Sequence, residues 1–493
     1  MKKLPILFIV LLIFAACQHS ERLTKSDLNQ ELKAASPIIL SQVHIINPTN
    51  GQISELSDVL IENGKITAIE SNIDSSDVAR INMKGKYLIP GFIDMHTHVF
   101  NEMDPRKTLN LFKAYGITGF REMAGSTELL KMRANGELPI LTNQPQLLAM
   151  PGDLLMPNTA GDPEEAVEKV RQQKAEGADF VKIAWVTPEV FYATLAEGKQ
   201  IGMRILGHVP GQVDMEMAAD SGLVSVEHLG MNFSGLAVAS TKKEELLAQA
   251  PSVPSIMKYM PEFATGLAHE MIEKKLINPM QGFSPEEFVR TTKILETYDQ
   301  QKSIMAAKHY ASAGMWQSPT LIRLKTSMLA FEQDNQSVSQ LQYISPEEIA
   351  KWKEVTKSYD ESLTKEQKDL LKMVYSKELE LVKLFADQGV KMFAGSDAVT
   401  AGWVVPGYSL HQEFDELEKA GLSPLQVLQM ATINGAEFLG KDEDLGTVAV
   451  GKMANLVILK ENPLESVQNL HSIDAVIING YYDEQKTLLD ALE

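Results

Sequence analysis

Short blocks of alternating apolar and polar residues occur at both ends of the chain. Between residues 38 and 90 the β-like segments are "IILSQVHIIN", "SDVLIENGKITAIES" and "ARINMKGKYLI", punctuated by Asn-Gly turns. The same pattern of short β-like segments occurs after residue 440, in "LGTVAVGKMANLVILK" and "IDAVIINGYY". We therefore predict that residues 38–90 and 440–489 together build one small β-sandwich.

Between these ends, over residues 91–439, a strand-then-helix rhythm repeats. The eight candidate strands are "GFIDMHTH", "TGFREMA", "QPQLLAM", "DFVKIAWV", "RILGHV", "VSVEHLG", "WQSPTLI" and "KMFAGSDA". Intervening helices are opened by a capping residue and a proline, as at Asp162-Pro163 and Thr187-Pro188. Eight such units predict an α/β fold with a TIM-like (β/α)8 barrel, whose active site forms at the C-terminal ends of the strands.

Two connections are longer than a minimal barrel requires. Residues 231–315 and 324–390 are helix-like and rich in Met, Lys and Glu, with a further cap at Ser345-Pro346. They could form a lid over the barrel mouth, and ordinary outer helices are an equal alternative.

The first residues differ from the rest. Two lysines precede the apolar stretch "LPILFIVLLIFAAC", which is too short for a confident membrane span and ends at Cys17, the single cysteine of the chain. Residues 1–17 resemble a lipoprotein signal peptide in which Phe14 replaces the usual leucine; an ordinary signal peptide is the alternative. Residues 18–37 are polar and predict a tether between lipid and folded body.

The composition narrows the choice of partners. With 46 basic and 65 acidic residues, the formal net charge is −19, which disfavours nucleic acid and anionic lipid. We expect the substrate to be a small molecule or a short peptide. Contact with a membrane is expected only through a lipid on Cys17, and the chain could form a homo-oligomer. The corresponding location is a bacterial cell envelope membrane, facing the periplasm or in the outer membrane.

Ionisable side chains recur at the predicted C-terminal ends of the strands. They are His96, His98, Lys182, His208, His228 and Asp397. Side chains alternate faces along a strand, so the first two histidines share a face and can hold one ion together. Imidazole nitrogen with carboxylate oxygen suits zinc, and six such groups at one barrel mouth could ligate two divalent metals.

Lys182 is the most informative member because it lies inside a strand that should be buried on both faces. Burial disfavours the charged amine and lowers its pKa. The neutral amine could add carbon dioxide and become a carbamate that bridges two metals. The alternative is a lysine that snorkels to water from the strand end.

Other members of the set also have structural interpretations. His208 could cap a turn, His228 could be a satisfied core histidine, and Asp397 could cap a helix. Because all six would have to coincide at one end of the barrel, we favour the metal centre.

At these residues the chain resembles the metal-dependent amidohydrolase superfamily, over roughly residues 38–485. "PGFIDMHTH" is similar to the family's first-strand signature, and "AGLSPLQVLQMATINGAEFLG" followed by "LGTVAVGKMANLVIL" is similar to its C-terminal stretch. Asn455 stands where the family usually has aspartate. The branch most resembled is the imidazolonepropionase-like one that includes Xaa-Pro dipeptidases.

The resemblance implies that His96, His98 and Asp397 hold one metal, that His208 and His228 hold a second, and that carbamylated Lys182 bridges them. Gly211 stands where deaminases tend to have glutamate, which counts against deamination. Lys182 itself counts against imidazolonepropionase, a one-metal enzyme.

The expected reaction is hydrolysis of an amide or peptide C–N bond, as in an Xaa-Pro dipeptide. A hydroxide shared by two metals, which we expect to be zinc, would attack the carbonyl, and Asp397 would transfer its proton. The alternatives are a one-metal cyclic-amide hydrolase or deaminase, and a surface lipoprotein that binds a ligand without turnover. Arg121 and Arg323 are candidates for binding a substrate carboxylate, or equally for structural ion pairs.

Overall fold

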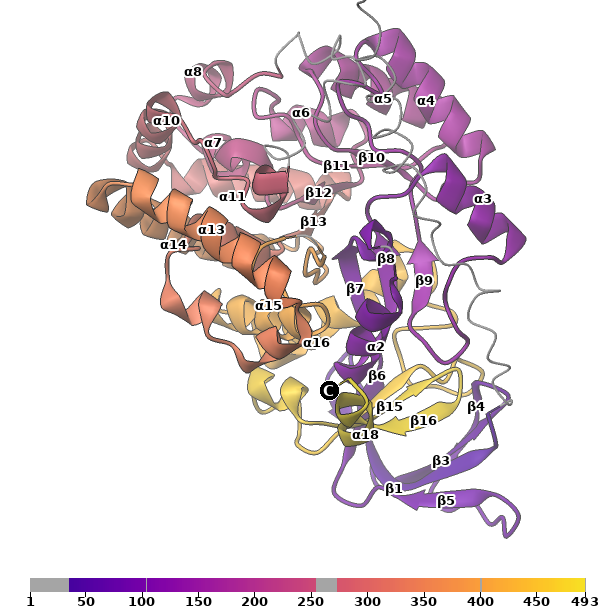
Figure 1. The fold of residues 1–493 in the computed structure, drawn as a ribbon. Helices are drawn as coiled ribbons and strands as arrows, with labels where there is room; N and C mark the ends of the chain where they lie inside the picture. The colour runs from indigo at the N-terminus through magenta and orange to yellow at the C-terminus, as the bar shows by residue number, and fades with distance from the viewer. Residues whose placement is uncertain (1–34, 103, 254–272, 400, 493) are drawn as a thin grey trace, which may run out of the picture.

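Strands from the two ends of the chain pair in one sheet, as Figure 1 shows in indigo and yellow. The computed structural model describes residues 35–102, 104–253, 273–399 and 401–492. The proposed signal peptide, Cys17 and nearly all of the proposed tether lie outside these ranges.

The strand order of this sheet is β16-β15-β14-β6-β1-β3-β4, with β2 and β5 also paired to β1. The strands are β1 (Ile38–Asn47), β2 (Gln52–Ile53), β3 (Ser57–Glu62), β4 (Lys65–Glu70), β5 (Ala79–Asn82), β6 (Tyr87–Pro90), β14 (Leu456–Leu459), β15 (Ile473–Ile478) and β16 (Tyr481–Glu484). The antiparallel pairing of β6 with β14 joins the two ends.

Alternation along β14 explains how this sheet is buried on both faces. Leu456 and Ile458 lie in a small apolar core with Leu40 from β1, whereas Val457 and Leu459 lie in the main core shared with the barrel. Successive side chains point to opposite faces of a strand. The sheet therefore packs on the barrel with one face and closes its own core with the other.

The barrel follows immediately after β6. Its strands are β7 (Phe92–Thr97), β8 (Ile117–Glu122), β9 (Gln146–Ala149), β10 (Val181–Ile183), β11 (Ile205–Gly207), β12 (Ser225–Glu227) and β13 (Trp316–Ser318). They form two parallel sheets, β7-β8-β9 and β10-β11-β12-β13. Parallel bridges close the ring: Pro151 with Phe180, Leu155 with Ile183, Gln317 with Met392, and Thr97 with Ala398.

The predicted eighth strand, "KMFAGSDA", has isolated bridges at Met392 and Ala398 and further backbone hydrogen bonds to β7, but it is not a continuous strand. The predicted seventh strand was too long. It ends at Ser318, because Thr320 adopts a left-handed φ of 45° and the next helix begins at Leu321.

The described ranges contain the following helices; in Figure 1 most of them surround the barrel, and the last one lies against strands β15 and β16. They are α2 (Arg106–Ala114), α3 (Thr127–Asn135), α4 (Pro163–Ala175), α5 (Pro188–Ile201), α6 (Met215–Asp220), α7 (Ser234–Ala237), α8 (Lys243–Ala248), α10 (Pro285–Glu296), α11 (Gln300–Ala313), α12 (Leu321–Met328), α13 (Pro346–Ser362), α14 (Lys365–Asp387), α15 (Tyr408–Lys419), α16 (Pro424–Ala431), α17 (Ile433–Phe438) and α18 (Gln485–Asp490), with 3-10 turns η2 (Val99–Asn101), η3 (Met231–Phe233), η5 (Gln333–Gln336), η6 (Ser339–Tyr343) and η7 (Val467–His471).

Each predicted cap-plus-proline signal starts a helix. The side chains of Asp162, Thr187 and Ser345 accept a hydrogen bond from the backbone N–H three residues on, and proline follows each of them. Such a side chain satisfies one of the free N–H groups of the first turn.

The two long connections supply outer helices and one segment near the barrel mouth. α14 packs against α10, α11, α12 and α15, as an ordinary outer helix does. On α13, Trp352 and Val355 instead pack with Ile277 and Trp403, and Trp403 belongs to the loop that follows Asp397.

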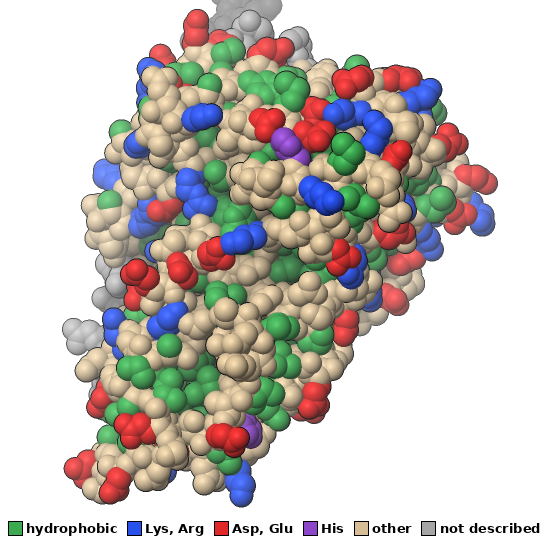
Figure 2. Space-filling model, turned by 180° about the vertical axis from the view of Figure 1, so that it is seen from behind, with side chains coloured by type: hydrophobic (Ala, Val, Ile, Leu, Met, Phe, Trp, Pro, Cys, Tyr) green, Lys and Arg blue, Asp and Glu red, His purple; other side chains and the backbone are tan. Residues whose placement is uncertain are grey.

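None of the helices in the described ranges combines the length and the hydropathy that a membrane span requires. On the face shown in Figure 2, acidic and basic side chains are interspersed and neither sign forms a continuous field.

Candidate metal centre

The six residues singled out in the sequence meet at one end of the barrel. His96 lies in β7, Lys182 in β10, and the other four follow their strands directly or, for Asp397, lie in the segment of the eighth strand. Their roles as ligands remain predictions, but their positions are close enough for one shared site.

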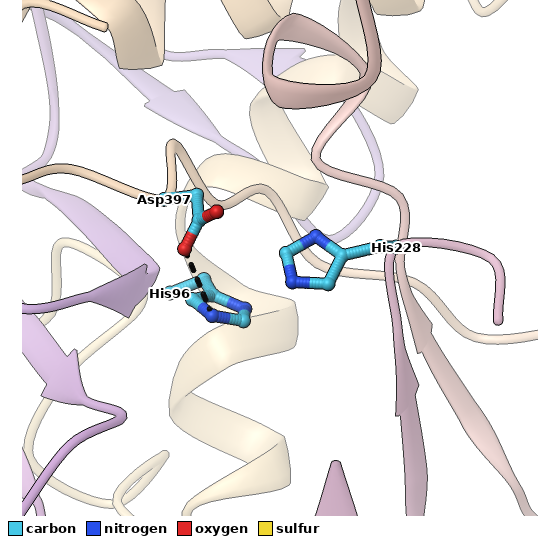
Figure 3. A group of neighbouring side chains, drawn as sticks. All are labelled: His96, His228 and Asp397. Atoms are coloured by element: carbon cyan, nitrogen blue, oxygen red, sulfur yellow. Dashed lines mark ion pairs between the residues drawn. The ribbon is translucent and has the colours of Figure 1, made fainter. Parts of the chain in front are cut away.

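Short distances connect them. Nε2 of His96 lies 3.2 Å from Asp397 Oδ1 and 3.2 Å from Lys182 Nζ, and His98 Nε2 lies 3.1 Å from the same Asp397 oxygen. The His228 ring centroid is 4.7 Å from that of His96 and 5.1 Å from that of His208. Candidate ligand atoms of His96, His228 and Asp397 all fall within 4.8 Å of one another, and Figure 3 shows these side chains converging from three segments.

Three of the histidines are oriented by acceptors behind them. Nδ1 of His96 lies 2.7 Å from Glu227 Oε2, Nδ1 of His208 lies 2.7 Å from the Ala184 carbonyl oxygen, and Nδ1 of His228 lies 2.5 Å from Thr320 Oγ1. The first two acceptors have no proton to give, and the Thr320 hydroxyl donates its own to the Pro319 carbonyl. Each Nδ1 is therefore the protonated nitrogen, and each Nε2 keeps a lone pair for a ligand.

Within the group of six, two buried imidazole nitrogens, His98 Nδ1 and His208 Nε2, have no hydrogen-bond partner among the described residues. Buried polar atoms are nearly always satisfied, so each such atom requires an explanation. A divalent metal is the partner that neutral imidazole nitrogens and a carboxylate suit best. The donor set therefore fits bound metal.

The backbone is strained where these side chains converge. His228, Asp397 and the β-branched Thr320 adopt positive φ values of 57°, 61° and 45°. Residues with a side chain rarely occupy this region, and such conformations concentrate at functional sites.

A glycine is required beside two of the six residues. Gly207 ends β11 at φ +126°, and a Cβ there would lie 2.3 Å from the carbonyl oxygen of Ile183. That same oxygen accepts a hydrogen bond from His208 N at 2.9 Å, and Ile183 follows Lys182 in β10. The close approach of β10 and β11 thus brings Lys182 and His208 together.

Lys182 is 2% exposed, so the alternative in which it snorkels to water is wrong. Burial lowers the pKa of its amine, and the neighbouring carboxylates of Asp397, Glu227 and Glu122 oppose that effect only in part. A lowered pKa enlarges the fraction of neutral amine, which is the form that can react with carbon dioxide.

Burial also favours neutral histidines. It lowers the pKa of His208 to about 3 and that of His228 to about 4, with the Lys182 charge contributing in both cases. The pKa of the Asp397 carboxyl is raised by burial, but the surrounding imidazoles outweigh this and hold it well below its usual range. At neutral pH the site therefore presents neutral imidazoles and an ionised carboxylate, the forms that bind metals.

The sequence reasoning missed Glu227, which is fully buried and bonded to His96. Strand alternation places neighbours on opposite faces, so Glu227 and His228 should not both face the site. The positive φ at His228 breaks that alternation. The only sequence signal was a charged residue inside a short buried strand.

Asp94 was also missed. Its carboxyl accepts hydrogen bonds from Ser396 Oγ at 2.6 Å, Ser396 N at 3.0 Å and His96 N at 3.1 Å. It thereby ties the end of β7 to the segment that carries Asp397. Burial raises the pKa of Asp94 to about 7 despite these donors.

Both candidate arginines form structural contacts. Arg121 is fully buried and ion-paired with Glu227 at 3.0 Å, so it has no access to a substrate. Arg323 places Nε 3.2 Å from Asp397 Oδ2 and donates to the carbonyl oxygens of Leu276 and Ile277. It links part of the first long connection to the centre.

The remaining described histidines lie elsewhere. His411, which follows the eighth strand, is buried and bonds the Tyr115 carbonyl through Nε2 at 2.9 Å. This contact is structural, because it joins α15 to the end of α2. His269 lies outside the described residues.

Parts of the chain are similar in sequence to known proteins. The model of the Amidohydrolase family matches residues 286–481. A curated dihydroorotase from Elusimicrobium minutum is 46% identical over 61 residues, which is 12% of this chain and 14% of that protein. An N-acetylglucosamine-6-phosphate deacetylase from Lysinibacillus sphaericus is 36% identical over 67 residues, 14% of this chain and 17% of that protein. These matches span far less than two thirds of either relative.

Solved structures match over nearly the whole chain. Bottromycin amidohydrolase has a TM-score of 0.66 at 19% identity, covering 94% of this chain and 89% of its own. A Xaa-Pro dipeptidase with bound methionine has a TM-score of 0.59 at 18% identity, covering 91% and 100%. A putative prolidase from Bifidobacterium longum has a TM-score of 0.60 at 20% identity, covering 93% and 100%. At these identities the likeness establishes the shared fold alone.

Proposed function

We propose that this chain is a metal-dependent hydrolase of carbon–nitrogen bonds and a member of the amidohydrolase superfamily. The family match over residues 286–481 and the shared fold support this membership. The observation that carries the proposal is Lys182, an amine almost without solvent contact whose Nζ lies 3.2 Å from His96 Nε2. A purely structural barrel has no need of an amine there.

The donor set divides into two groups around this lysine. His96, His98 and Asp397 would hold one divalent ion, and His208 and His228 a second, with a carbamate on Lys182 as the bridge. Zinc is the ion we propose, because imidazole and carboxylate ligands suit it. Divalent ions bound there would lower the pKa of water to about 7 and polarise a substrate carbonyl.

Asp397 would move the proton. Its Oδ1 receives contacts from His96 and His98 and its Oδ2 from Arg323. These contacts fix the carboxylate at the mouth of the barrel, where it could take a proton from the attacking water and pass it to the leaving nitrogen.

For the substrate we propose an amide or a short peptide, with an Xaa-Pro dipeptide as the first to test. The shared fold with a Xaa-Pro dipeptidase supports this choice. The second candidate is a cyclic amide cleaved by a one-metal centre, and the short matches to dihydroorotases favour it. Turnover of either substrate would distinguish these two candidate enzymes from a lipoprotein that only binds a ligand.

We further propose that Cys17 carries a lipid that anchors the enzyme to the bacterial cell envelope. The hydrophobic stretch before Cys17 and the polar residues after it support this anchor. Labelling of whole cells with a radioactive or alkyne-bearing fatty acid, compared between wild type and Cys17→Ser, tests it.

Replacement of Lys182 tests the bridging role. Lys182→Ala should abolish hydrolysis of the dipeptide, and added short carboxylic acids should restore part of it by taking the place of the carbamate. Lys113→Ala is a matched control, because Lys113 is also buried but pairs with Asp483 in the outer layer. Unchanged activity of Lys182→Ala would disprove the bridge.

A further inference from the structure

A buried charge pair lies behind His96. Glu227 Oε2 is 2.7 Å from His96 Nδ1, and Arg121 Nη2 lies 3.0 Å and 3.1 Å from the two Glu227 oxygens. All three side chains are fully buried. Water therefore does not screen the pair, and its charges act directly on the imidazole.

The pair is held rigidly from both sides. Ser225 Oγ donates to Glu227 Oε1 at 3.0 Å, and Arg121 Nε donates to the Met95 carbonyl at 2.6 Å, one residue before His96. The Arg121 guanidinium also lies over the rings of Phe393 and Phe438, at 4.8 Å and 5.4 Å from their centroids. Neither charged group can turn away without breaking several contacts.

His96 differs in this respect from the two other oriented histidines. His208 donates to a neutral carbonyl and His228 to a neutral hydroxyl, whereas His96 alone donates to a carboxylate. A carboxylate at Nδ1 makes the imidazole a stronger electron donor at Nε2 and fixes both its tautomer and its ring orientation.

We propose that Glu227, held by Arg121, is a positioning residue that sets the affinity of the centre for the ion that His96 would hold. This inference rests on the proposed metal centre. Glu227 would not touch substrate or reacting atoms and would act only through His96. A pair that served stability alone would leave metal affinity unaffected in any variant that folds.

Zinc binding to the metal-free protein, measured by competition with a chromophoric chelator, tests the inference without reference to activity. Glu227→Gln keeps the side-chain volume and an acceptor for Nδ1–H but removes the charge. It should weaken zinc binding at one site by about 10–100-fold, the usual effect of removing such a partner. Arg121→Met/Glu227→Gln removes both charges, so that no unpaired guanidinium remains, and should show the same loss if the single variant does not fold.

Glu416→Gln is the matched control. Glu416 is also a buried glutamate, paired with Lys325 at 2.9 Å and Lys419 at 2.7 Å, but it contacts no histidine of the centre. Its variant should lose stability and keep zinc affinity.

The outcomes separate the inference from the proposed function. Zinc affinity that stays at the wild-type value in the folded Glu227 variants would overturn the positioning role and leave the metal centre standing. A wild-type protein that binds no zinc would overturn the proposed function, and the inference with it.

Discussion

Gly207→Ala should damage the centre without touching any proposed ligand. The new Cβ would lie 2.3 Å from the Ile183 carbonyl oxygen, far inside the optimal contact distance of about 3.5 Å. The pairing of β10 with β11 would have to open by about 1 Å, which moves Lys182 away from His208.

The cost has two parts. A residue with a side chain at φ +126° is strained by on the order of 1–3 kcal/mol. Forcing an extra carbon into a packed region typically costs about 1–3 kcal/mol more. We therefore expect a loss of about 2–6 kcal/mol in the free energy of unfolding, together with a loss of bound zinc.

Gly202→Ala is the matched control. Gly202 also has a positive φ of +69°, but a Cβ there would meet no atom within 4 Å. Only the left-handed conformation is penalised, by about 1–2 kcal/mol. Urea unfolding and zinc content would be measured for both variants. Equal destabilisation of the two, or full zinc content in folded Gly207→Ala, would refute the reasoning.

Two further predictions concern buried charges. Burial raises the pKa of Glu378 from 4.5 to about 8, so the folded state favours the neutral acid. The stability that this preference contributes is complete below about pH 4.5 and is lost as the pH rises to about 8. The loss in the free energy of unfolding over this range is on the order of 4 kcal/mol. Glu378→Gln should therefore raise the unfolding midpoint at pH 8 and leave it nearly unchanged at pH 4.5; equal shifts at both pH values would contradict this assignment. Arg121→Met should lower the free energy of unfolding by about 3–5 kcal/mol, because it leaves the Glu227 charge buried and unpaired. Adding Glu227→Gln to it should recover part of that loss in urea unfolding, and a further loss would argue against the ion pair.

The sequence was sufficient for the parts of the fold that depend on local pattern. Several buried strands ended in a polar residue, as β7 does at Thr97 and β13 at Ser318, and cap-plus-proline signals marked helix starts such as those of α4 and α13. Because parallel strands end at the same edge, residues as distant in sequence as His96 and Asp397 could be placed together.

Other features depended on backbone geometry that side-chain pattern does not encode. The left-handed turn at Thr320 ended the seventh strand early, and the one at His228 brought Glu227 to the site against the period of a strand. The pairing of Arg121 with Glu227 joins strands β8 and β12 across the barrel interior. No short-range signal specifies such a contact.

Metal content per chain tests the central claim most directly. The protein without residues 1–17 would be purified with bicarbonate and without chelator, and its zinc and other divalent ions measured by mass spectrometry. The account predicts about two equivalents, falling to one or fewer in Lys182→Ala. One equivalent or none in the wild type would contradict the bridged two-metal centre.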